Sequence, residues 1–142
     1  MFGLPIRRER SPGVIVVDTS ALMAIARAEA NADRLKSCLQ ASSLVVMSAG
    51  TLAEALVVAG HRGMRAAILE MVADLDIAIV PVTGQDAHDV AAAHHRWGRG
   101  AHPAGLNFGD CFAYALAMAR GWPLLYVGDD FARTDVAPAL PA

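Results

Sequence analysis

The amino-acid sequence predicts a single three-layer α/β/α domain with a central, mostly parallel sheet of four or five strands. The chain has 142 residues, of which 55% are hydrophobic and 18% charged, which is enough for one buried core. Short β-branched apolar runs alternate with longer segments of helical period. Within each run the apolar residues are continuous rather than alternating, as expected of strands that helices cover on both faces.

Four apolar runs are predicted to be strands because each is short and bounded by polar or turn-forming residues. They are residues 14–17, 43–47, 77–80 and 123–127. The alanine- and leucine-rich segments between them are predicted to be helices. These cover residues 21–39 with a break near Asn31, 50–75 with a break near 60–63, 87–97, and 108–120. Strands that alternate with helices pair in parallel through right-handed crossovers, which gives the three layers.

Composition excludes several classes of protein. No apolar stretch approaches the roughly 20 residues of a membrane span. The arginine-rich opening lacks the apolar segment of a secretory signal. The two cysteines, Cys38 and Cys111, lie far apart and in no metal-ligand or disulfide spacing. We therefore expect a cytoplasmic protein without a membrane partner. Because the net charge is −2, any site for a polyanion must be local.

Acidic residues recur where the predicted strands end and the following helices begin. Asp18 ends the first strand, Glu54 follows the second, and Asp110 opens the last helix. Asp129 and Asp130 follow the last strand. Since the carboxyl ends of parallel strands meet at one edge of a sheet, where open α/β folds bind ligands, these acids are expected to converge there.

Each acid also has an ordinary structural explanation. Asp18 or Thr19 can cap the helix that follows. Capping-box spacing relates two further pairs, Thr51 with Glu54 and Asn107 with Asp110. Caps need no common location, however, and close carboxylates repel one another unless a cation compensates. Ligation by oxygen alone favours Mg²⁺ or Mn²⁺, and such an ion promotes hydrolysis of a phosphate ester by water.

Four motifs occur in a fixed order between residues 14 and 136: VIVVDTSAL, TLAEALVV, HPAGLNFGDCFAYALA and PLLYVGDDFARTDV. In order and spacing they resemble the PIN-domain ribonucleases, and specifically the VapC-type toxins of bacterial toxin–antitoxin pairs. The resemblance implies a PIN-like fold over residues 14–142 and an Mg²⁺- or Mn²⁺-dependent endoribonuclease that cuts RNA. It also implies a VapB-like antitoxin as partner, and a homodimer.

The family's four acidic site residues fall on Asp18, Glu54, Asp110 and Asp130 of this sequence. The resemblance implies that all four are catalytic and hold the metal. Asp18 and Asp110 are expected to be the principal ligands, because both lie at the ends of predicted elements, where the side chain can reach the edge of the sheet. Secondary roles are expected for Thr19, Ser20, Asn107, Asp129 and Asp135.

RNA binding is expected from basic residues near the acids. The segment from His94 to Asp110 contains glycine and proline, which predicts a loop. Positive groups beside an acidic cluster are suited to hold phosphates, and the candidates are Arg96, Arg99, His102 and Arg133. Two interpretations of Trp97 stay open: the ring stacks on a base, or it anchors the loop to the core.

The chain departs from the family pattern at its start, because residues 1–13 precede the first predicted strand and read as a flexible arm. One interpretation is that Arg7, Arg8 and Arg10 of this arm bind RNA. The other, which we favour, is that the arm results from an upstream translation start and has no role.

Three other functions compete with the toxin. A PIN-like nuclease of RNA processing needs the same residues, and a neighbouring antitoxin gene discriminates the two. A non-catalytic binding module has no reason to hold like charges together. A phosphoacceptor that uses Asp18 as nucleophile needs a nearby lysine, and the one lysine, Lys36, lies in the middle of a predicted helix.

Overall fold

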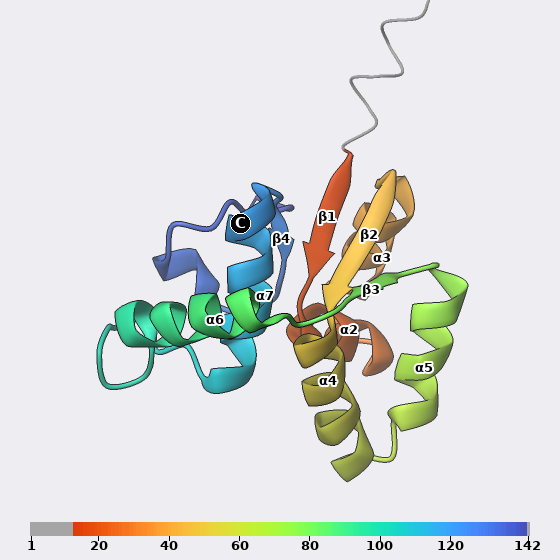
Figure 1. Cartoon of the computed structure of the whole chain (residues 1–142). Helices are drawn as coiled ribbons and strands as arrows, with labels where there is room; N and C mark the ends of the chain where they lie inside the picture. The colour runs from red at the N-terminus through yellow and green to blue at the C-terminus, as the bar shows by residue number, and fades with distance from the viewer. Residues whose placement is uncertain (1–12, 142) are drawn as a thin grey trace, which may run out of the picture.

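The structure, a computed structural model, describes residues 13–141, which form a four-stranded parallel sheet between two layers of helices (Figure 1). The strands are β1 (Val14–Val17), β2 (Leu44–Ser48), β3 (Ala78–Val80) and β4 (Leu124–Leu125). They lie in the order β3-β2-β1-β4, and every neighbouring pair is parallel. The predicted three-layer α/β/α fold is thereby confirmed. The predicted arm, apart from Gly13, lies outside the described residues.

The helices follow the predicted segments and both predicted breaks. They are α2 (Thr19–Ala26), α3 (Ala32–Ala41), α4 (Ala49–His61), α5 (Arg65–Asp74), α6 (Gly84–Trp97), α7 (Phe108–Arg120) and the short 3-10 helix η1 (Phe131–Arg133). Helix α6 begins three residues before its predicted start because Thr83 and Asp86 form a capping box there. Over residues 13–141 no helix has both the length and the apolar character needed to cross a membrane.

Side chains of the strands alternate between two cores, one on each face of the sheet. Val16 and Val46 belong to the core that α6 and α7 complete. Ile15, Val45 and Met47 belong to the core formed with helices α2 to α5. Since β1 and β2 are parallel and lead directly into α2 and α4, the N-termini of these two helices lie at the same edge of the sheet (Figure 1).

Strand β4 is shorter than predicted, with two residues in place of five. The backbone N–H of Val127 donates to Ser20 Oγ at 3.0 Å rather than to a neighbouring strand. Gly128 then turns the chain with a φ of +106°. This hydrogen bond connects the segment after β4 to Ser20 in the first turn of α2, two residues after Asp18.

Candidate metal centre

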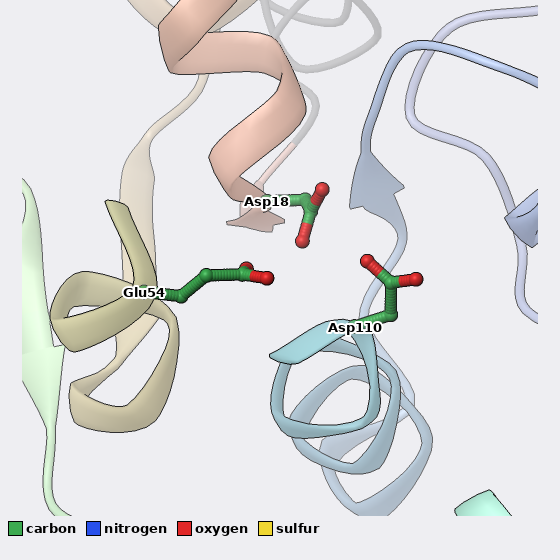
Figure 2. A group of neighbouring side chains, drawn as sticks. All are labelled: Asp18, Glu54 and Asp110. Atoms are coloured by element: carbon green, nitrogen blue, oxygen red, sulfur yellow. The ribbon is translucent and has the colours of Figure 1, made fainter. Parts of the chain in front are cut away.

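Three carboxylates from three different parts of the chain meet at the edge of the sheet (Figure 2). Asp18 precedes α2, Glu54 lies in α4, and Asp110 lies in the first turn of α7. One oxygen from each carboxylate lies within 4.8 Å of the other two. Figure 2 shows the three side chains pointing toward a common space between the helices.

Asp18 caps helix α2 with only one of its two oxygens. Oδ2 accepts hydrogen bonds from the Ser20 backbone N–H at 3.0 Å and from the Ser20 hydroxyl at 2.7 Å. The other oxygen, Oδ1, is buried and has no hydrogen-bond partner among the described residues. Because a buried acceptor without a donor is costly, an oxygen left in this state fits a ligand to a cation. The cap and the metal ligand are thus compatible roles of one side chain.

Glu54 is oriented by the helix opposite it. The Thr19 hydroxyl lies 3.0 Å from Glu54 Oε1 and 3.2 Å from the Thr51 carbonyl oxygen, and it donates toward both. Ser48 caps α4 instead of Thr51, because the helix begins before Thr51 and the Ser48 hydroxyl accepts the Gly50 N–H at 3.1 Å. The expected capping box of Thr51 with Glu54 is therefore wrong, and the Glu54 carboxylate is free to join the cluster.

Asp110 combines the predicted cap with a place in the cluster. Its Oδ2 accepts the Asn107 backbone N–H at 3.0 Å, and its own N–H donates to Asn107 Oδ1 at 2.8 Å. This reciprocal pair fixes the first turn of α7 and directs the carboxylate toward Asp18.

Gly109 is a residue of the site that the sequence analysis did not single out. A Cβ atom at this position would overlap the Glu54 carboxylate, at 2.8 Å from Oε1 and closer to Oε2 and Cδ. The absence of a side chain therefore lets α7 approach Glu54 closely enough to place Asp110 beside it. The glycine is visible in the sequence, where the motif reads Phe-Gly-Asp. Its role depends on the packing of α4 against α7, which the sequence does not show.

Burial and mutual repulsion raise the pKa values of two carboxyl groups in the cluster. Burial is the largest cause that raises the pKa of Asp18 to about 7, and Asp110 and Glu54 raise it further. Burial likewise raises the pKa of Asp110 to about 6, with contributions from Glu54 and Asp130. The hydrogen bonds from Ser20 and Asn107 oppose these shifts without cancelling them. A divalent cation would offset both shifts, because its charge stabilises the ionised carboxylates.

The raised pKa values predict a pH dependence of stability in metal-free protein. Between about pH 4 and pH 7 the folded carboxylates hold protons that the unfolded chain has already released, so the free energy of unfolding falls as the pH rises. Since Mn²⁺ binds only the deprotonated carboxylates, the rise in Tm that it produces should be larger at about pH 8 than at about pH 5.5. Thermal unfolding at both pH values, with and without Mn²⁺, measures this difference. Metal-free Asp18→Asn protein should show a weaker pH dependence, and an equal Mn²⁺ effect at both pH values would contradict the assignment.

The remaining acidic candidates lie at different distances from the cluster. Asp130 is exposed and outside the group of three, although it is near enough to raise the pKa of Asp110. Asp129 is also exposed and lies outside the group. Asp135 is engaged elsewhere, since its carboxylate accepts the Tyr114 hydroxyl at 2.6 Å and pairs with Arg96 at 3.7 Å.

Trp97 is an anchor of the core. It is 8% exposed, and its indole N–H donates to the Tyr114 hydroxyl at 2.9 Å. Residues 94–97 form the last turn of α6, so the predicted loop begins only at Gly98. The structure thus favours the anchoring interpretation of this ring over stacking on a base.

The basic candidates for RNA binding differ in the groups that they contact. Arg99 is near enough to Asp110 to lower the pKa of that carboxyl, against the larger effect of burial. Arg133 is exposed and donates to the Pro103 carbonyl at 3.4 Å. His102 supports its own loop, because its Nδ1 accepts the Ala104 N–H at 2.9 Å and its ring packs against Trp97.

Comparison with known proteins identifies the fold and the family. A family model described as "PIN domain" matches residues 15–137. Ribonuclease VapC30 of Mycobacterium tuberculosis is 40% identical over 132 residues, covering 89% of this chain and 100% of the relative. Ribonuclease VapC28 of the same species is 39% identical over 130 residues, with 89% and 98% covered.

Solved structures share the same architecture. The Mycobacterium tuberculosis toxin VapC20, described as cleaving the sarcin-ricin loop, matches with a TM-score of 0.71 at 19% identity, covering 87% of this chain and 96% of that one. VapBC-5 of the same species, a toxin–antitoxin system, matches with a TM-score of 0.61 at 27% identity, covering 90% and 95%. The family model and the identity to two ribonucleases over nearly their whole length lead to one assignment. The chain belongs to the PIN-domain family, among the VapC ribonucleases.

Proposed function

We propose that this protein is a divalent-metal-dependent endoribonuclease that acts as the toxin of a toxin–antitoxin pair. The observation that carries the proposal is the group of three carboxylates, in which Asp18 has one buried oxygen, Oδ1, without a hydrogen-bond partner among the described residues. The donors are all carboxylate oxygens, the ligand type that Mg²⁺ and Mn²⁺ prefer. Two similar relatives, Ribonuclease VapC30 and Ribonuclease VapC28, are named as ribonucleases, which supports the reaction class.

Asp18 and Asp110 are the residues proposed to hold the ion, because each keeps one oxygen free after its helix cap is made. Glu54 completes the negative charge, and Thr19 fixes its carboxylate by a hydrogen bond. Asp130 is proposed to act from the rim of the site, where it is exposed. When bound, Mg²⁺ or Mn²⁺ would supply Lewis acidity for the RNA phosphate and activate the attacking water.

The protein's own basic residues would orient the RNA and reduce the repulsion between its phosphate and the carboxylates. Three ionised carboxylates repel a phosphate diester, so a bound cation and nearby basic side chains must compensate their charge before RNA can approach. Arg99 is the side chain best placed to contribute, since it already acts on Asp110. Its planar guanidinium suits a phosphate, and we propose that it holds the strand beside the site. Arg133, which is exposed and within residues 13–141 makes only a 3.4 Å hydrogen bond to the Pro103 carbonyl, is proposed as a second phosphate contact. Arg96 instead pairs with Asp135, and His102 accepts the Ala104 N–H.

A VapB-like antitoxin is the proposed protein partner. Toxin–antitoxin complexes are among the solved structures that share this fold. The product of a neighbouring small gene should co-purify with the protein and suppress its cleavage of RNA. Cleavage that no neighbouring gene product inhibits would favour the alternative of an RNA-processing nuclease.

The reaction is tested by incubating total bacterial RNA with purified, antitoxin-free protein. Discrete fragments should form with Mg²⁺ or Mn²⁺, disappear when a chelator is added, and return when excess Mn²⁺ is restored. Sequencing of the fragment ends identifies the cleaved bond. If folded protein produces no fragments with either metal, the proposed reaction is wrong and a non-catalytic binding module becomes the better account.

A further inference from the structure

We propose that Phe108 is the base-stacking residue of this site: its ring receives an unstacked base of a single-stranded RNA segment whose phosphate lies at the carboxylate cluster. The inference rests on the proposed function and adds to it the form of RNA that is bound. It also adds a residue that contributes to the choice of substrate.

Phe108 is unusually exposed for its size. Its side chain is 67% exposed, which is the largest value among the large apolar residues over 13–141. It is the first residue of α7, two positions before Asp110. Phe108 adjoins Gly109, whose missing side chain makes room for the Glu54 carboxylate, so a strand bound at the cluster passes this end of α7.

The folding of α7 does not require an aromatic residue at this position. Asn107 and Asp110 already cap the helix. Leu106 and Cys111, at the positions of a hydrophobic staple, are both fully buried in one core cluster. Phe108 therefore contributes little to the start of the helix, and its exposure is not a consequence of capping.

A second ring supports Phe108 from one side. The Phe112 ring meets it edge to face, with the centroids 5.0 Å apart and the planes at 79°. Phe112 itself rests on the backbone of α4, since a Cβ atom on Gly50 would overlap the ring. A ring held in this way loses little freedom when a ligand binds, which favours stacking.

The charges around Phe108 favour a nucleotide over an apolar protein surface. An oxygen of Glu54 lies within 4.8 Å of an oxygen of Asp110, which is in the first turn of α7, and Arg99 acts on Asp110. An apolar partner that covered the ring would desolvate these charged groups without pairing them. An RNA strand brings a base for the ring together with a phosphate for the arginine and the metal.

The test compares cleavage of a single-stranded oligoribonucleotide that the wild type cuts. Phe108→Ala should lower kcat/KM by about 5- to 150-fold, the equivalent of one lost base stack, whereas Phe108→Trp should stay near the wild-type value. Removing the base at each position of the oligonucleotide in turn should reveal one position where Phe108→Ala causes no further loss. Met118→Ala, which truncates a 42% exposed side chain at the other end of α7, is the matched control and should have no effect.

Affinity for single-stranded oligoribonucleotides of random sequence, measured in chelator, provides a second readout that does not depend on cleavage, and it separates this inference from the proposed function. If the wild type cleaves no RNA, the proposed function fails, and the affinity of Phe108→Ala still decides whether the ring contacts RNA. If cleavage and affinity are both unchanged in folded Phe108→Ala, the stacking inference is overturned. If the substitution instead abolishes dimer formation or antitoxin binding and leaves RNA affinity intact, the ring belongs to a protein interface, which also overturns it.

Discussion

Replacing Asp110 with asparagine is expected to lower the rate of metal-dependent RNA cleavage by on the order of 10² to 10³-fold while the domain stays folded. Asparagine keeps the shape of the side chain and an oxygen that can still accept the Asn107 N–H. The cap of α7 is therefore preserved. The negative charge is lost, and with it one of the two principal ligands proposed for the metal. Initial rates at saturating Mn²⁺, measured beside thermal unfolding, test both parts of this expectation.

The chain supplies a matched control for this substitution. Asp86 occupies the same position in the capping box of α6, where its Oδ2 accepts the Thr83 N–H at 2.8 Å, and it is not part of the carboxylate cluster. Asp86→Asn should therefore leave the cleavage rate unchanged. Equal losses in the two variants would mean that helix capping, rather than metal binding, explains the effect of Asp110.

Gly109→Ala is expected to lower the apparent affinity for Mn²⁺, and the cleavage rate at limiting Mn²⁺, by about 10- to 100-fold. The new methyl group would occupy the space of the Glu54 carboxylate. Glu54 is a flexible side chain at a half-buried position, so it can move away without unfolding the domain. Alanine also has the higher helix propensity, by up to about 1 kcal/mol, which keeps α7 stable. The expected variant is folded but has a displaced metal ligand.

Two further variants make this result specific. Gly60→Ala adds the same methyl group to α4 at a position where it would meet no other segment of residues 13–141 within 4 Å, and it should not affect Mn²⁺ affinity. Adding Glu54→Asp to Gly109→Ala shortens the displaced side chain and should recover part of the affinity. Full Mn²⁺ affinity in Gly109→Ala alone would show that the close approach of α7 to Glu54 has no role in the site.

The parts of the site that depend on local pattern could be predicted from the sequence. Asp18 ends a β-branched run and Asp110 follows Asn107 at capping-box spacing, and both features are set by residues within a few positions. The parallel order of the strands then brings the two acids to one edge. The helix breaks near Asn31 and residues 60–63 are local in the same way.

Other features depend on contacts between distant segments and could not be predicted. Glu54 owes its orientation to Thr19, which is 35 residues away in the sequence. Thr51 has the sequence spacing of a cap, but Ser48 starts the helix earlier and removes that role. The end of α6 extends into the expected loop because Trp97 reaches Tyr114 on a neighbouring helix. The exposure of Phe108 likewise follows from where α4 and Phe112 lie.

The central claim is that Asp18, Glu54 and Asp110 together hold a divalent ion, and the position of Mn²⁺ in crystals of the protein tests it most directly. Anomalous diffraction should be recorded at a Mn²⁺ concentration that supports RNA cleavage, with Asp110→Asn crystals as the comparison. The expected result is an anomalous peak between the three carboxylates, bonded to Asp18 Oδ1, that is lost or much weakened in the variant. A peak at another site, or an undiminished peak in Asp110→Asn, would contradict the claim.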